Sequence, residues 1–88
     1  MATLVLSTAW TQGGRSRFDC GSGPLHEVLK RFADDHPQYR HRILGADGEP
    51  FRYFNVHIDD RVVPRREREE AVVHEHSTLF IVPPLAGG

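Results

Sequence analysis

The last six residues of the chain carry its clearest chemical feature. They read Pro83-Pro84-Leu85-Ala86-Gly87-Gly88. Glycine has no Cβ, so a Gly87-Gly88 end can enter a narrow channel and bring its carboxylate close to a reactive group of another protein. The diproline is stiff, and six residues can project roughly 20 Å from the body of a domain. The pattern predicts that the Gly88 carboxylate is a substrate, with Leu85 and Ala86 lining the partner's channel.

The chain carries no motif that could activate this carboxylate by itself. A free carboxylate is a poor acylating agent, and its activation consumes ATP to form an acyl-adenylate. The sequence contains neither a Gly-x-x-x-x-Gly-Lys-Ser/Thr phosphate loop nor a Gly-x-Gly-x-x-Gly turn. We therefore expect no catalytic residue and no bound cofactor in this chain, and a separate adenylating enzyme that uses the ATP. The alternative is that residues 83–88 are an ordinary frayed terminus.

Three other places could do chemistry, but each has a simpler interpretation. The segment 74–76 reads His-Glu-His, yet the sequence supplies no second cluster to complete a metal site, so we expect no metal and a solvated surface there. Cys20 lies on an apolar alternation without an activating motif, and we expect a buried thiol. Asp59 and Asp60 are adjacent, so on a strand they would point to opposite faces, and we expect a turn.

The composition bounds the class of protein. The 88 residues hold 11 Lys and Arg against 12 Asp and Glu, a formal charge of −1. A chain of this size buries one hydrophobic core and leaves little to line a deep catalytic cleft. The near-neutral charge argues against a nucleic-acid binder, and no run of about 18 apolar residues could cross a membrane. The single cysteine and the absence of a signal-peptide pattern lead us to expect a cytoplasmic protein.

Hydrophobic periodicity and turn residues predict the elements that position the tail. The segment 25–32 repeats apolar residues at helical spacing, so we expect a helix that begins near Pro24, is capped by Ser22 or Gly23 and ends before residue 37. A further helical turn is expected over 39–44. Alternating or apolar runs predict strands at 3–8, 15–20, 51–58, 61–63 and 78–82. We expect turns at 12–14, 59–60 and 74–77, a loop at 45–50, a solvated charged run at 65–70 and an apolar patch at 71–73.

The order of these elements predicts an α+β fold. A hairpin, a helix and then further strands suit a mixed sheet with one main helix packed across one face. The first and last strands are apolar enough to be central, parallel neighbours. We expect a body over residues 1–82 and a flexible diglycine tail over 83–88. Phe80 and Val82 would face outward beside the tail and suit docking of a partner, while Arg61 and Arg65 would steer an acidic partner surface.

Two segments resemble the MoaD/ThiS-like family of sulfur-carrier proteins. Residues 51–60 read Phe-Arg-Tyr-Phe-Asn-Val-His-Ile-Asp-Asp and resemble that family's F-V-N-V-Y-V-N-D strand. Residues 79–88 read Leu-Phe-Ile-Val-Pro-Pro-Leu-Ala-Gly-Gly and resemble its V-x-I-x-P-P-V-A-G-G end. The resemblance covers essentially the whole chain, and the chain looks most similar to the CysO-type carriers of cysteine biosynthesis. It implies a β-grasp, ubiquitin-like fold.

The resemblance also implies a function and partners. In that family an E1-like enzyme adenylates the C-terminal glycine, here Gly88, which becomes a thiocarboxylate that donates sulfur. The implied partners are an E1-like enzyme of the MoeB/ThiF type, a sulfur-accepting synthase and a JAMM-type metalloprotease. The acceptor stays open among cysteine, thiamine, molybdopterin and other metabolites. Two alternatives stay open as well: a ubiquitin-like modifier conjugated through Gly88 to lysines, and a non-catalytic β-grasp interaction module.

Overall fold

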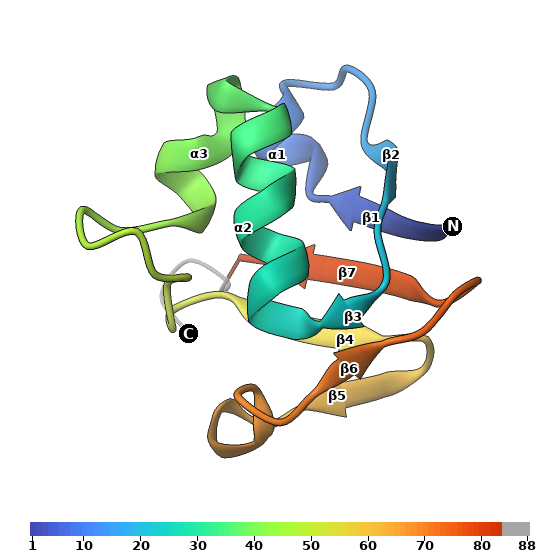
Figure 1. Ribbon diagram of the computed structural model, residues 1–88. Helices are drawn as coiled ribbons and strands as arrows, with labels where there is room; N and C mark the ends of the chain where they lie inside the picture. Colours follow the sequence, from blue (N-terminus) through green and yellow to red (C-terminus); the bar gives the residue numbers. More distant parts are fainter. Residues whose placement is uncertain (84–88) are drawn as a thin grey trace.

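A five-stranded mixed sheet forms the frame of the computed structural model, which describes residues 1–83 (Figure 1). Its strands are β1 (Ala2–Leu6), β2 (Arg17–Cys20), β4 (Asn55–Ile58), β5 (Arg61–Val63) and β7 (Thr78–Val82). They lie in the order β2-β1-β7-β4-β5, with β7 parallel to β1 and antiparallel to β4. The first and last strands are therefore central, parallel neighbours, as the sequence predicts.

One long helix packs across a face of this sheet. The helices are α1 (Thr8–Thr11), α2 (Leu25–Asp35), α3 (Pro37–Ile43) and the short 3-10 helix η1 (Arg65–Glu67). α2 lies in front of the sheet in Figure 1 and buries one apolar stripe, made of Leu25, Val28, Leu29 and Phe32. These residues share a face because they recur at helical spacing, so the predicted main helix is confirmed. Within residues 1–83, no helix is both long and apolar enough to cross a membrane.

Alternate residues of β7 face opposite sides of the sheet. Leu79 and Ile81 are buried in the core, whereas Phe80 is only half-buried and Val82 is 39% exposed. Successive side chains of a strand point to opposite faces, so Phe80 and Val82 lie on the face away from the core. That orientation is the one predicted from the alternation.

The segment after β1 is a short helix. The prediction of a strand that continues to residue 8 and then turns into a simple hairpin was therefore wrong at its end. β1 ends at Leu6, and Ser7 caps α1 because its Oγ accepts a hydrogen bond from the Ala9 amide at 3.1 Å. Trp10 turns inward from α1 and packs edge-on against Phe54, with the ring centroids 6.1 Å apart. The apolar Trp10 is thus buried from a helix rather than from a strand.

The start of α2 also differs from the prediction. Neither Ser22 nor Gly23 caps the helix, and Pro24 occupies the cap position without a side-chain hydrogen bond. Instead, β3 (Gly23–Pro24) pairs with β6 (Val72–Val73) in a two-stranded antiparallel sheet. Gly23 enters this pairing with a φ of 128°, a conformation that favours glycine. The predicted apolar patch at 71–73 is therefore part of a β-pair that anchors the start of α2.

β4 is shorter than the strand predicted over 51–58. It begins at Asn55, and the four residues before it are irregular. Their backbone has a different partner, because the guanidinium of Arg65 donates hydrogen bonds to two of their carbonyls. A side chain from η1 thus takes the place of a neighbouring strand and holds the segment 51–54 beside η1.

Candidate functional site

The end of β7 is where the predicted reactive tail begins. Val82 is the last residue of this central strand and pairs with Asn55 of β4. β7 lies between β1 and β4 and pairs with both as far as Ile81, while Val82 pairs with β4, so the sheet fixes the point of attachment. The predicted channel and reaction residues lie outside the described residues: Leu85, Ala86, Gly87 and Gly88.

An apolar patch lies next to this point, on the outer face of the sheet. This outer patch consists of Phe80 and Val82, and His57 of β4 is the register partner of Phe80. Val62 of β5 pairs with His57 in turn and is 61% exposed. The outer face therefore presents apolar side chains on β7 and β5, with His57 of β4 between them, and those of β7 lie at the end of the described chain.

The two arginines predicted to steer a partner lie at opposite ends of β4. Arg61 is exposed and pairs with Ile58, at the end of β4 away from the tail. Arg65 lies at the other end, where its Nε donates to the Arg52 carbonyl at 2.5 Å and its Nη2 donates to the Tyr53 carbonyl at 3.2 Å. The structure does not bring the two side chains together, and it gives Arg65 a role in holding the chain that leads into β4.

Arg68 shows that the predicted solvated run at 65–70 was wrong at one position. Its side chain is only 6% exposed, whereas the other residues of the run are exposed. Nη2 donates to the Phe54 carbonyl at 2.6 Å, and the guanidinium carbon lies 5.6 Å from the centre of the Phe54 ring. Burial, followed by the nearby charges of Arg65 and Arg52, lowers the pKa of Arg68 from its usual value. Nothing in the charge pattern of the run distinguishes this arginine from the exposed ones.

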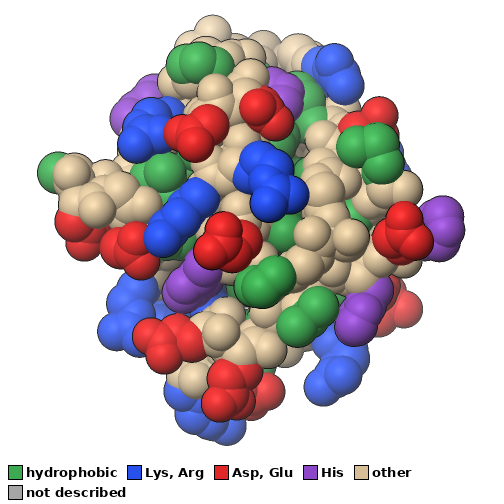
Figure 2. Space-filling view, in the orientation of Figure 1, with side chains coloured by type: hydrophobic (Ala, Val, Ile, Leu, Met, Phe, Trp, Pro, Cys, Tyr) green, Lys and Arg blue, Asp and Glu red, His purple; other side chains and the backbone are tan. Residues whose placement is uncertain are grey.

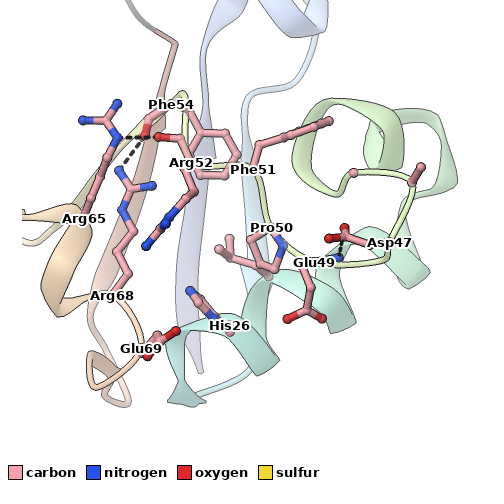
Figure 3. A pocket seen from close by; sticks show the side chains of 13 residues that line it. His26, Asp47, Glu49, Pro50, Phe51, Arg52, Phe54, Arg65, Arg68 and Glu69 are labelled. Atoms are coloured by element: carbon pink, nitrogen blue, oxygen red, sulfur yellow. Dashed lines mark hydrogen bonds between the residues drawn. The ribbon is translucent and has the colours of Figure 1, made fainter.

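A hollow of about 660 Å³ lies beside Arg68 (Figure 3). Its walls come from α2, from the segment 45–54 and from the turn after β5. In Figure 3, Arg65 and Arg68 lie beside Phe54 at one end of the hollow, where the Arg52 side chain also extends into it, while Glu69 lies below them next to α2 and Asp47 lies at the opposite end. We call the first of these the arginine end. The sequence pattern does not reveal this grouping, because the contributing residues lie in separate segments.

The other candidates from the sequence, Cys20 and the segment 74–76, belong neither to the outer patch nor to the lining of the hollow. Cys20 is buried, and burial together with the nearby charge of Asp19 raises the pKa of its thiol. The residues 74–76 are exposed, and within residues 1–83 no group of three or more His, Cys, Asp or Glu side chains is placed to hold a metal ion. On the face of the molecule drawn in Figure 2, acidic and basic side chains are intermixed around α2.

The fold and the family of the chain are settled by comparison with known proteins. Residues 10–88 match the ThiS family. The structure of the BexX/CysO complex from Amycolatopsis orientalis matches with 24% identity, 100% of both chains covered and a TM-score of 0.80. SAMP1 from Haloferax volcanii matches with 23% identity, 99% of this chain and 98% of its own covered, and a TM-score of 0.74.

CysO from Mycobacterium tuberculosis, described as an antigen, matches with 16% identity, 97% of this chain and 100% of its own covered, and a TM-score of 0.77. No curated protein sequence matches the chain. The structural matches share the mixed sheet with a helix packed across it, and the family match extends through the diglycine end. The chain therefore belongs to the ThiS family and has the β-grasp fold of ubiquitin-like sulfur carriers.

Proposed function

We propose that this protein is a sulfur carrier whose Gly88 carboxylate is adenylated by an E1-like enzyme and converted to a thiocarboxylate. The observation that carries the proposal is the family match through residue 88, on a tail that follows a central, doubly paired strand. Such a strand fixes the point on the body from which the chain continues after Val82. A partner can therefore bind the body and receive the terminal residues in one defined direction.

The chemistry needs only the carboxylate from this chain. An oxygen of the Gly88 carboxylate attacks the α-phosphorus of ATP, the bond to the β-phosphate breaks, and pyrophosphate leaves. A sulfur nucleophile then attacks the acyl carbon of the adenylate, and AMP leaves with the former carboxylate oxygen. The E1-like enzyme supplies the nucleotide site, while Gly87 supplies a slim approach to it.

The outer patch is the docking surface that this proposal requires. Phe80 and Val82 lie next to the start of the tail, and a partner that covers them also meets the tail. Exposed apolar side chains gain free energy when a partner removes them from water. The structure of a CysO protein in complex with BexX supports partner binding by this fold.

Downstream partners follow from the same chemistry. On a sulfur-accepting synthase, the thiocarboxylate sulfur attacks an electrophilic carbon of the acceptor and displaces a leaving group, which joins Gly88 to the acceptor through an acyl bond. A JAMM-type metalloprotease then adds water to this acyl bond, which releases the sulfur-containing product and restores the Gly88 carboxylate. These reactions belong to biosynthesis in the cytoplasm. The acceptor of the sulfur is a metabolite of the cysteine, thiamine, molybdopterin or a related pathway.

A second candidate function is protein modification through the same terminus. The matches to SAMP1, a small archaeal modifier protein, favour this alternative. In that case a lysine amine of a target protein attacks the adenylate, AMP leaves, and an isopeptide bond forms at Gly88. Adenylation is common to both functions, so only the acceptor distinguishes them.

Intact-mass measurement after incubation with an E1-like enzyme, ATP and sulfide tests the proposal. A carrier gains the mass difference between sulfur and oxygen, whereas a modifier forms covalent adducts with target proteins. An unchanged mass and no complex with the enzyme would instead identify an interaction module. Deletion of Gly88, or Gly87→Phe, should abolish the mass gain while the thermal midpoint stays the same. Persistent adenylation of these variants would contradict the proposal.

A further inference from the structure

Arg68 is a buried cation with unused hydrogen-bond donors. A guanidinium carries five N–H groups, and the Phe54 carbonyl accepts one of them from Nη2. Nε and Nη1 are buried and have no acceptor among the described residues. Buried donors in proteins are nearly always paired with protein atoms, ordered water or a bound group. The unused N–H groups therefore indicate that an acceptor belongs at this position.

The charges around Arg68 indicate that the acceptor is an anion. Arg52 and Arg65 are close enough to lower the pKa of Arg68, so three cations share the arginine end. No carboxylate within residues 1–83 forms an ion pair with any of them. The ion pairs in that range join other residues: Lys30 with Glu49, Arg40 with Asp34, and Arg66 with Glu67. Like charges gathered in this way repel each other, and an anion placed among them offsets the cost of this repulsion.

We propose that the arginine end of the hollow binds an oxyanion, which is a carboxylate or a phosphate group. Arg68 supplies the buried donors, in charge-assisted hydrogen bonds of the kind that arginine forms with both groups. Arg52 is exposed and has no side-chain hydrogen bond among the described residues, so its guanidinium can move to admit the anion and then cover it. Arg65 already uses Nε and Nη2 on backbone carbonyls and contributes mainly charge.

Two sources can supply this oxyanion. One is free inorganic phosphate. The other is the Gly88 carboxylate, because Val82, next to the last described residue, pairs with Asn55, and Asn55 follows Phe54, whose carbonyl binds Arg68. Five further residues extend at most about 17 Å. The site exists in either case, and it does not depend on the proposed function.

A phosphate titration of the full chain followed by NMR tests the site. We expect saturable shifts of the Arg68 and Arg52 side-chain N–H signals and of the Phe54 amide, at constant ionic strength set with chloride. Arg52→Gln should weaken phosphate binding by about tenfold, since it removes one charge-assisted contact. The matched control is Arg66→Gln in η1, where the side chain is 84% exposed and lies outside the hollow. It should change the affinity by about twofold or less.

Linear shifts without saturation, or equal weakening by Arg52→Gln and Arg66→Gln, would overturn the proposal, because both results describe a general counter-ion atmosphere. A second measurement does not depend on how well a variant folds. Phosphate should raise the thermal midpoint of the natural chain and of Arg66→Gln, and raise that of Arg68→Met much less. An equal rise in all three would also overturn it.

The source is identified with the full chain whose Gly88 ends in a carboxamide. If the chain's own carboxylate is the occupant, the carboxamide form binds phosphate more tightly and its Arg68 N–H signals shift before any phosphate is added. If a free oxyanion is the occupant, the two forms bind phosphate equally. Both results require the arginine site, and they differ only in what fills it.

Discussion

Lys30 of α2 and Glu49 of the loop before β4 form an ion pair, with Nζ 2.7 Å from Oε2. The hydrogen bond to Glu49, more than any other influence, raises the pKa of Lys30. Lys30 is the only lysine of the chain. An acylating agent reacts with the neutral amine, so this pairing keeps the one side-chain amine of the chain less reactive toward an activated carboxylate.

We predict that Glu49→Gln speeds the acylation of Lys30 severalfold. Loss of the carboxylate lowers the pKa of the amine toward its ordinary value, and the neutral fraction at mildly alkaline pH rises. Peptide mapping after a short pulse of acetic anhydride measures the rate. The control is Asp47→Asn, because Asp47 makes the smallest contribution to the Lys30 pKa. Equal rates in the two variants would contradict the role of the Glu49 pair.

The cap of α1 gives a prediction about stability. Ser7→Ala removes the Oγ acceptor of the Ala9 amide and should lower the free energy of unfolding by about 1 kcal/mol. Urea unfolding monitored by the fluorescence of Trp10, the only tryptophan, measures this change. Ser22→Ala is the matched control, since Ser22 is exposed and makes no side-chain hydrogen bond among the described residues. A similar loss in both variants would show that the cap contributes nothing.

The missed helix α1 illustrates which parts of the fold the sequence predicts. The periodic segments were predictable: the stripe of α2 and the alternation of β7 each report a buried face directly. α1 is a single turn whose only inward residue is Trp10, and one buried residue defines no period. The β3–β6 pair could not be predicted either, because a strand of two residues is recognised only when its partner is already known.

Part of the candidate site could likewise be predicted from the sequence, and part could not. The diglycine end and the outward direction of Phe80 and Val82 follow from local sequence. The burial of Arg68 does not, because it depends on a contact between Arg68, the residue after η1, and Phe54, which lies 14 positions earlier in the chain. Side chains of separate segments meet at the arginine end only after the sheet and α2 have set their places.

Cys20 gives a prediction about pH. Burial raises the pKa of its thiol above the ordinary value of 9.0, so the unfolded chain loses this proton at a lower pH than the folded chain. The thiol therefore contributes stability that is fully present below pH 9.0 and is lost as the pH rises through the folded-state pKa. Unfolding experiments between mildly alkaline pH and pH 10 measure the slope. Cys20→Ala should lower the stability at every pH but flatten this slope, and an unchanged slope would contradict the assignment.

The outer patch gives a prediction about partner binding. Val82→Glu places a charge beside the start of the tail, where the proposed E1-like partner would have to desolvate it, so affinity should fall by about tenfold or more. Val72→Glu is the matched control, because Val72 is 44% exposed against 39% for Val82 but belongs to the separate β3–β6 pair. Both variants should keep the thermal midpoint of the natural chain within a few degrees. Calorimetric titration against the activating enzyme measures the affinities. If Val72→Glu weakens binding as much as Val82→Glu, the partner does not bind specifically to the outer face of β7, and this result would contradict the assignment of the docking surface.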